Sequence, residues 1–163
     1  MEWLKWIGIV ALALVIAALL AGRLGWLQGR APADLGVRDG RLKPPARTPN
    51  SVSSQAALYP GHPRREQAQI EPLHYQGDGA EAMARLARVV EAMPGARLQR
   101  SDAGYLYATY TTPLMRYVDD VEFALDPAAS VIHVRSASRL GHGDRGLNRE
   151  RIEEVRRRFD AAH

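Results

Sequence analysis

The chain has 163 residues, with 22 Lys and Arg against 18 Asp and Glu, no cysteine, and 46% hydrophobic residues. This length allows one small domain and not two large ones. The absence of cysteine excludes a disulfide scaffold, a thiolate zinc site and a cysteine nucleophile.

The N-terminal segment is predicted to span a membrane. Residues 6–22 are all apolar or glycine, and Trp26 extends the run because Arg23 can carry its charge to the interface. A spanning helix needs about 20 such residues. Trp6 and Trp26 are spaced to lie at two interfaces about 30 Å apart. The sequence therefore favours a retained anchor.

A cleaved signal peptide is the main alternative, ahead of a buried core helix. Leu19 and Leu20 stand two positions before Ala21 and Gly22, where a cleavage site needs small residues. The orientation of the anchor is open. More basic residues follow the segment than precede it, which favours a cytoplasmic domain, but this rule weakens for long translocated domains.

A proline-rich segment follows the anchor. Seven of the ten prolines lie between Pro32 and Pro72, so neither a continuous helix nor a central strand is expected there. Composition favours a solvated linker. The alternative is an ordered loop packed on the domain, in which Asn50 and the nearby serines bond the backbone in turns.

The rest of the chain is predicted as a helix, four strands and a second helix. Asp78 is expected to cap a helix that Pro94-Gly95 ends. Asn148 is expected to cap a last helix, whose apolar stripe contains Ile152, Val155 and Phe159. The predicted strands form two hairpins: residues 96–101 with 105–112, and residues 117–125 with 130–138.

The second hairpin has a predicted register. A symmetric loop at residues 126–129 places Phe123 opposite Ile132 and Val121 opposite Val134, on one apolar face. On the other face, two polar pairs would lie opposite each other: Asp120 with Arg135, and Glu122 with His133.

Asp119-Asp120 has the appearance of a catalytic carboxylate pair, but the strand geometry argues against it. Neighbouring residues on a strand point to opposite faces, so these two carboxylates cannot act together. Asp119 lies at the rim of the apolar face and needs a cationic partner if it is buried. Arg139 and Arg116 are the expected candidates.

Residues 141–146 contain a G-x-G-x-x-G pattern between a strand and a helix. A dinucleotide fold also needs a parallel βαβ unit and an acidic residue about 20 positions later, and neither is predicted here. The pattern is therefore interpreted as a turn, with anion binding by its amides as an alternative. The histidines show no metal-binding spacing, so no metal or cofactor is expected.

Three stretches, residues 48–56, 117–123 and 134–151, resemble the domain of unknown function 1499 family. The similarity covers about residues 42–158. Relatives are small exported or membrane-anchored bacterial proteins without an established activity, cofactor or ligand. The resemblance implies that the loop at Pro49-Asn50 belongs to the domain, and it favours a periplasmic location. Many relatives have cysteines where Pro45 and Ser51 stand here, which implies a dispensable disulfide.

These inferences give one expected architecture. The fold class is α+β: one transmembrane helix, then a small domain with a four-stranded, mainly antiparallel sheet and two flanking helices. The expected boundaries are an anchor at residues 1–28, a linker at 29–43, and a domain at 44–163 that includes a proline-rich loop at 44–72. We expect a single-pass protein of the bacterial inner membrane, with its domain in the periplasm.

The expected function is a binding or scaffolding module at the cell envelope, and a hydrolase-type enzyme using the Asp, Glu and Arg cluster is the alternative. The expected partners are the bilayer, through residues 3–27, and an envelope protein of unknown identity, but not nucleic acid. No catalytic residue is assigned. The candidate binding cluster comprises Asp119, Asp120, Arg135, Ser136, Ser138, Arg139, Asp144 and Asn148.

Overall fold

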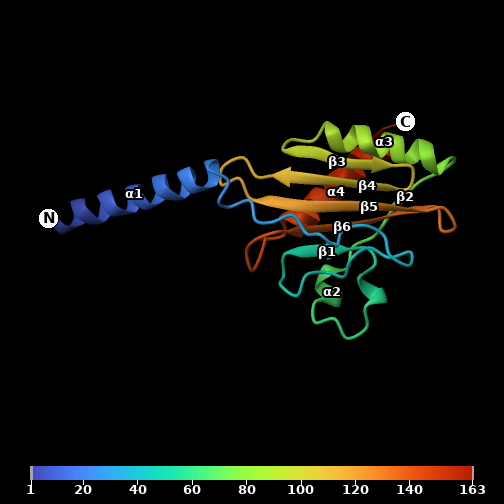
Figure 1. Cartoon of the computed structure of the whole chain (residues 1–163), viewed down its shortest axis with the longest axis horizontal. Helices are drawn as coiled ribbons and strands as arrows, with labels where there is room; N and C mark the ends of the chain where they lie inside the picture. Colours follow the sequence, from blue (N-terminus) through green and yellow to red (C-terminus); the bar gives the residue numbers. More distant parts are fainter. Residues whose placement is uncertain (1, 163) are drawn as a thin grey trace.

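The computed structural model describes residues 2–162 and contains one six-stranded sheet with helices on one face (Figure 1). The helices are α1 (Glu2–Arg23), the short η1 (Ala56–Leu58) and α2 (Arg65–Ala68), then α3 (Gly79–Glu91) and α4 (Leu147–Ala161). The strands are β1 (Ser51–Ser53), β2 (Leu73–His74), β3 (Ala96–Asp102), β4 (Tyr105–Thr111), β5 (Val118–Asp126) and β6 (Val131–Ser138). Their order in the sheet is β1-β6-β5-β4-β3, and β2 also pairs with β6.

The predicted α+β class is confirmed, but the predicted number of strands is wrong. The two additional strands, β1 and β2, come from the proline-rich segment and pair antiparallel with β6. They contain three and two residues, which is too short for an alternating pattern to be visible in the sequence. The loop at Pro49-Asn50 therefore belongs to the domain, as the family resemblance implies.

The hydrophobic core lies between the sheet and the pair α3 and α4. Every second residue of β5 and β6 points into it, including Phe123 and Ile132, and α4 contributes Val155 and Phe159. Asp78 caps α3 as predicted, because its side chain accepts a hydrogen bond from the N–H of Glu81 at 2.9 Å.

The hairpin of β5 and β6 is shifted by two residues from the predicted register. Phe123 pairs with Val134, not with Ile132. The turn occupies residues 127–130, because the Asp126 side chain accepts hydrogen bonds from the two N–H groups at residues 128 and 129, and Ser130 adopts a left-handed φ of 55°. A shift of two residues leaves every side chain on its predicted face.

The G-x-G-x-x-G pattern lies in the loop between β6 and α4. Because β6 runs antiparallel to β5 and to β1, the loop does not belong to a parallel βαβ unit. The structure agrees with the sequence argument against a dinucleotide fold.

Among residues 2–162, α1 is the one helix that is long and apolar enough to cross a membrane. A signal sequence near the N-terminus passes the same test of length and composition. In Figure 1, α1 extends away from the sheet along the long direction of the molecule.

The segment between α1 and β1 crosses the face of the sheet opposite α3 and α4. Leu42 is buried there with Tyr105 and Ala124. Part of residues 29–43, which the sequence predicts as a linker, is thus packed on the domain.

Candidate functional site

The structure divides the eight predicted cluster residues between the two faces of the sheet. Five lie on the face covered by α4, or in the turn that leads into it: Asp119, Ser136, Ser138, Asp144 and Asn148. Three lie on the opposite face: Asp120, Arg135 and Arg139. Asp119 and Asp120 point to opposite faces, as predicted, so the eight residues do not form one site.

Asp119 is held by an arginine from α4. The Arg151 guanidinium lies 2.5 Å from the Asp119 carboxylate, and it packs over the Tyr110 ring at 4.8 Å from the centroid. Both side chains of the ion pair are nearly buried. The expected partners, Arg139 and Arg116, are wrong, because Arg139 points to the other face.

Asn148 is the centre of the network beneath α4. Its side-chain carbonyl accepts hydrogen bonds from Arg151, at 2.7 Å, and from Ser136. Its amide nitrogen donates to the Asn50 carbonyl and the Ser138 hydroxyl, each at 3.0 Å. These bonds fasten α4 to β6 and to the loop before β1.

The predicted capping role of Asn148 is wrong. The helix begins at Leu147, after Gly146 in a left-handed conformation, and Asn148 lies buried in its first turn. Asp144 takes the capping role, because its carboxylate accepts hydrogen bonds from the N–H groups of Gly146 and Asn148.

On the opposite face, Asp120 is bound by Arg139 and Tyr107. The Arg139 guanidinium donates to both carboxylate oxygens, at 2.7 and 3.0 Å, and the Tyr107 hydroxyl donates at 2.6 Å. Burial, together with the hydrogen bond to Asp120, raises the pKa of Tyr107 to about 12. Tyr107 therefore remains a donor across the neutral pH range.

Glu122 and Arg135 form a second ion pair on this face, at 3.3 Å, and both side chains are almost fully buried. The predicted pairs, Asp120 with Arg135 and Glu122 with His133, are wrong because of the shift in register. Glu122 also accepts hydrogen bonds from the Tyr105 hydroxyl, at 2.8 Å, and from the backbone N–H of Gly36, at 2.7 Å. Burial is the main cause of the raised pKa of Tyr105.

We call residues 34–44 the strap. The Glu122–Arg135 pair holds it at two places, because Glu122 binds Gly36 and the Arg135 side chain donates to the Pro44 carbonyl at 3.1 Å. Between these two points the chain forms a tight hairpin at residues 38–41. The backbones of its first and last residues exchange two hydrogen bonds of 2.9 Å.

The turn of this hairpin is Asp39-Gly40. Both residues have positive φ angles, of 51° and 71°, which is the geometry of a type I′ turn. The Gln55 side chain fixes the strap from the other side: it donates to the Gly40 carbonyl and accepts from the N–H of Leu42. The Tyr59 hydroxyl also donates to the Leu42 carbonyl.

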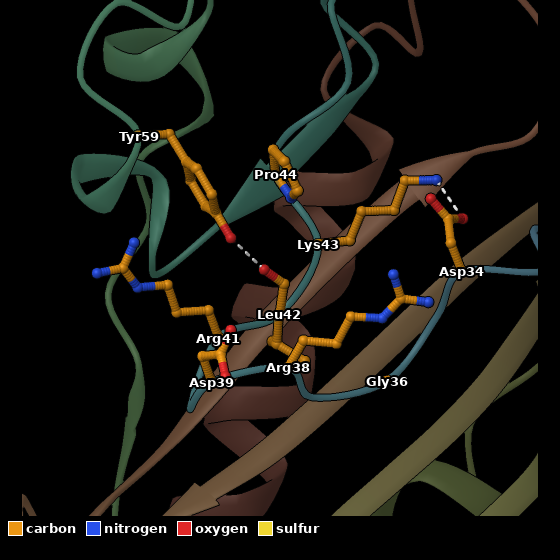
Figure 2. Close-up of a pocket in the computed structure, with 9 residues that line it drawn as sticks. All are labelled: Asp34, Gly36, Arg38, Asp39, Arg41, Leu42, Lys43, Pro44 and Tyr59. Carbon is orange, nitrogen blue, oxygen red and sulfur yellow. Dashed lines mark hydrogen bonds and ion pairs between the residues drawn. The ribbon is translucent and has the colours of Figure 1, made fainter.

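A pocket of about 260 Å³ is built on the strap (Figure 2). It is lined by Asp34, Gly36, Arg38, Asp39, Arg41, Leu42, Lys43, Pro44 and Tyr59. Figure 2 shows Arg38 and Lys43 extending on the same side, toward Asp34, whereas Arg41 extends away from them.

Among the residues that the structure describes, one cation at this pocket has an acidic partner, and two do not. Lys43 binds Asp34 at 2.6 Å, and this hydrogen bond lowers the pKa of Asp34. Arg38 and Arg41 form no ion pair within the described residues 2–162. Burial raises the pKa of Tyr59, while the charges of Arg41 and of Arg135 act in the opposite direction.

The arrangement is suited to holding an anion. Two exposed guanidiniums stand at facing positions of the hairpin, and the buried Arg135 lies close enough to act on Asp34 and Tyr59 electrostatically. Within the described part of the chain, no group of three or more His, Asp or Glu side chains is placed to hold a metal ion.

Sequence reasoning missed two parts of this site. Arg151 lies three residues after Asn148 and therefore on the same face of α4, so helical periodicity was a signal that could have found it. The strap carries no comparable signal. Its short hairpin contains an Asp-Gly turn, but the flanking residues are charged rather than alternately apolar.

Two comparisons bear on the identity of the chain. A search of curated proteins found no match. The family model described as "Protein of unknown function (DUF1499)" matches residues 41–159, which confirms the family resemblance. The chain belongs to the DUF1499 family.

Proposed function

We propose that this protein is a membrane-tethered binding module that holds an anionic group in the pocket on the strap. In this proposal α1 remains in the bacterial inner membrane and the domain binds its partner at the cell envelope. A phosphate or carboxylate would fit, whether it belongs to a small molecule or to an envelope protein.

One observation carries the proposal. Arg38 and Arg41 lie directly opposite each other in a hydrogen-bonded pair, where like charges destabilise a hairpin. The Asp-Gly turn nevertheless fixes this arrangement. An anion bound at this hairpin would relieve the unpaired positive charge, and arginine is the side chain best suited to binding carboxylate and phosphate oxygens.

The predicted polar cluster contributes to this site indirectly. Its member Arg135 and the ion-pair partner Glu122, which was not in the predicted cluster, do not line the pocket, but they bind the strap on either side of the hairpin, at Pro44 and Gly36. Arg135 is therefore a positioning residue in the proposal. The network around Asn148 fastens α4 on the far face of the sheet and does not reach the pocket.

The location of the domain is part of the proposal. The similarity to exported and membrane-anchored relatives supports a periplasmic domain, although the basic residues that follow α1 favour the opposite orientation. The hydrolase alternative is favoured by no specific contact. Its carboxylates Asp119, Asp120 and Glu122 are each held by a guanidinium.

We use pyrophosphate as the probe for the pocket. It is titrated into the full chain in lipid nanodiscs, and calorimetry measures its binding. We expect the double variant Arg38→Gln/Arg41→Gln to bind pyrophosphate at least tenfold more weakly than the natural chain, because it loses both unpaired guanidiniums. Arg135 and the fold of the strap remain in this variant.

The matched control is Arg88→Gln/Arg97→Gln, which removes the same charge from exposed positions on α3 and β3. This control is expected to bind pyrophosphate as the natural chain does. Equal weakening in the two double variants would mean that net charge alone attracts the anion, and would contradict the proposed pocket.

A further inference from the structure

Exposed apolar side chains gather at the end of the domain that is nearest to α1. Leu114 and Tyr117, in the loop between β4 and β5, are 68% and 37% exposed, and Leu140 and Leu147 are also exposed. Figure 1 shows the β4–β5 loop beside the last turn of α1 and the β6–α4 loop at the same end of the sheet. Exposed apolar side chains that gather in one place mark interaction sites, so we expect a partner to cover this end of the domain.

The end of α1 is packed directly against this loop. Gly22 is buried, and a Cβ atom at that position would lie 2.6 Å from the carbonyl oxygen of Met115. A second glycine, Gly29, packs in the same way against the side chains of Arg139 and Leu140. The helix therefore meets the domain without a free spacer, and a membrane around α1 would lie next to both loops.

The residues around the apolar side chains match the surface of a bilayer. Trp26 is exposed beside the end of α1, and indole rings favour the interface between headgroups and hydrocarbon. Arg23 and Arg30 are exposed at the end of α1 and just after it, and Arg116 is exposed in the β4–β5 loop. Their positive charge is complementary to anionic headgroups.

We infer that Leu114, Tyr117 and Leu140 form a docking surface for the lipid headgroup region, which holds the domain flush against the membrane that α1 spans. This inference rests on the proposed tether. The occupant is lipid because the surface is continuous with α1, because exposed arginines accompany it in the β4–β5 loop and at the end of α1, and because no spacer separates it from the helix.

The absence of cysteine from the chain allows single labels to be placed without background. The full chain is reconstituted into vesicles of phosphatidylcholine and phosphatidylglycerol, with one variant for each label. An environment-sensitive fluorophore is attached at Leu114→Cys, at Leu12→Cys within α1, or at Ala128→Cys in the turn at the far end of β5. Spin-labelled lipid is then added as a quencher.

The labels at positions 12 and 114 are expected to shift to shorter emission wavelengths and to be quenched several-fold, while the label at position 128 remains unquenched. Quenching at 12 with a label at 114 that behaves like the one at 128 would overturn the docking surface and leave the tether standing. An unquenched label at 12 would overturn the proposed tether itself.

A second variant separates docking from mere closeness to the tether. With the label at Leu140→Cys, the additional changes Leu114→Glu and Arg116→Glu are expected to reduce quenching several-fold, because they remove the apolar contact and reverse the charge. Unchanged quenching at position 140 would show that the helix alone holds the loop near lipid, and would contradict the inference.

Discussion

Replacing Glu122 by Gln is expected to lower the free energy of unfolding by about 3–5 kcal/mol, since removing one partner of a buried ion pair leaves the other charge uncompensated. The Glu122 side chain is fully buried and that of Arg135 is almost so. Gln keeps the size of the side chain and an acceptor for Gly36 and Tyr105, so the loss reports the missing charge. Denaturant unfolding of the full chain in detergent measures it.

Glu153→Gln is the matched control for this variant. Glu153 pairs with Arg156 on the outer side of α4, where 42% of its side chain is exposed. A surface pair of this kind contributes about 0–1 kcal/mol. If Glu122→Gln cost no more than Glu153→Gln, the buried pair would not be what holds the strap on the sheet.

Asp119→Asn is expected to cost about 1.5–3 kcal/mol, the usual contribution of a hydrogen bond to a charged group. The effect is smaller than that at Glu122 because Arg151 keeps three other partners: the side-chain carbonyl of Asn148, the hydroxyl of Ser136 and the ring of Tyr110. Denaturant unfolding gives the magnitude. Faster amide hydrogen exchange in the first turns of α4 would locate the loss at the contact between helix and sheet.

Asp102→Asn makes the same chemical change at an exposed pair with Arg100 and is expected to cost less than about 1 kcal/mol. The Asp119 prediction also distinguishes a structural from a binding role on this face. Normal pyrophosphate binding by a destabilised Asp119→Asn chain would agree with a fastening role. Loss of binding with unchanged stability would contradict it.

The face of each residue in the sheet could be predicted from the sequence, whereas the register could not. The alternation of Val121 and Phe123 with polar neighbours has a period of two, and this separates Asp119 from Asp120 whatever the register. The register depends instead on where the turn closes. The Asp126 side chain closes the turn by accepting a hydrogen bond from the backbone N–H of Ala128. The assumption of a symmetric loop does not take this hydrogen bond into account.

The packing of the strap could not be predicted from composition. Prolines exclude long regular elements, but they do not prevent a chain from lying on a sheet when its backbone groups find partners there. Here those partners are Glu122, Arg135 and Gln55, which are distant in sequence from the backbone groups that they bind. Such contacts follow from the tertiary fold and leave no periodic trace in the strap.

The assignment of Arg151 shows the same limit. The sequence predicts that a buried Asp119 needs a cationic partner. The candidates are Arg116 and Arg139, the arginines nearest to the strand ends. The true partner comes from α4, because the helix packs on β6 and Arg151 in its first turns reaches Asp119 on the neighbouring strand β5. The need for a partner was predictable from burial, but the identity of that partner depended on how the helix lies on the sheet.

The proposed tether would place every other feature of the molecule beside a membrane, and alkaline carbonate extraction with intact-mass analysis tests this proposal most directly. Because α1 contains the uncharged residues 6–22, the chain is expected to stay in the membrane pellet with a mass that includes them. Release of the chain into the supernatant, or a mature protein that begins after Trp26, would contradict a lasting anchor.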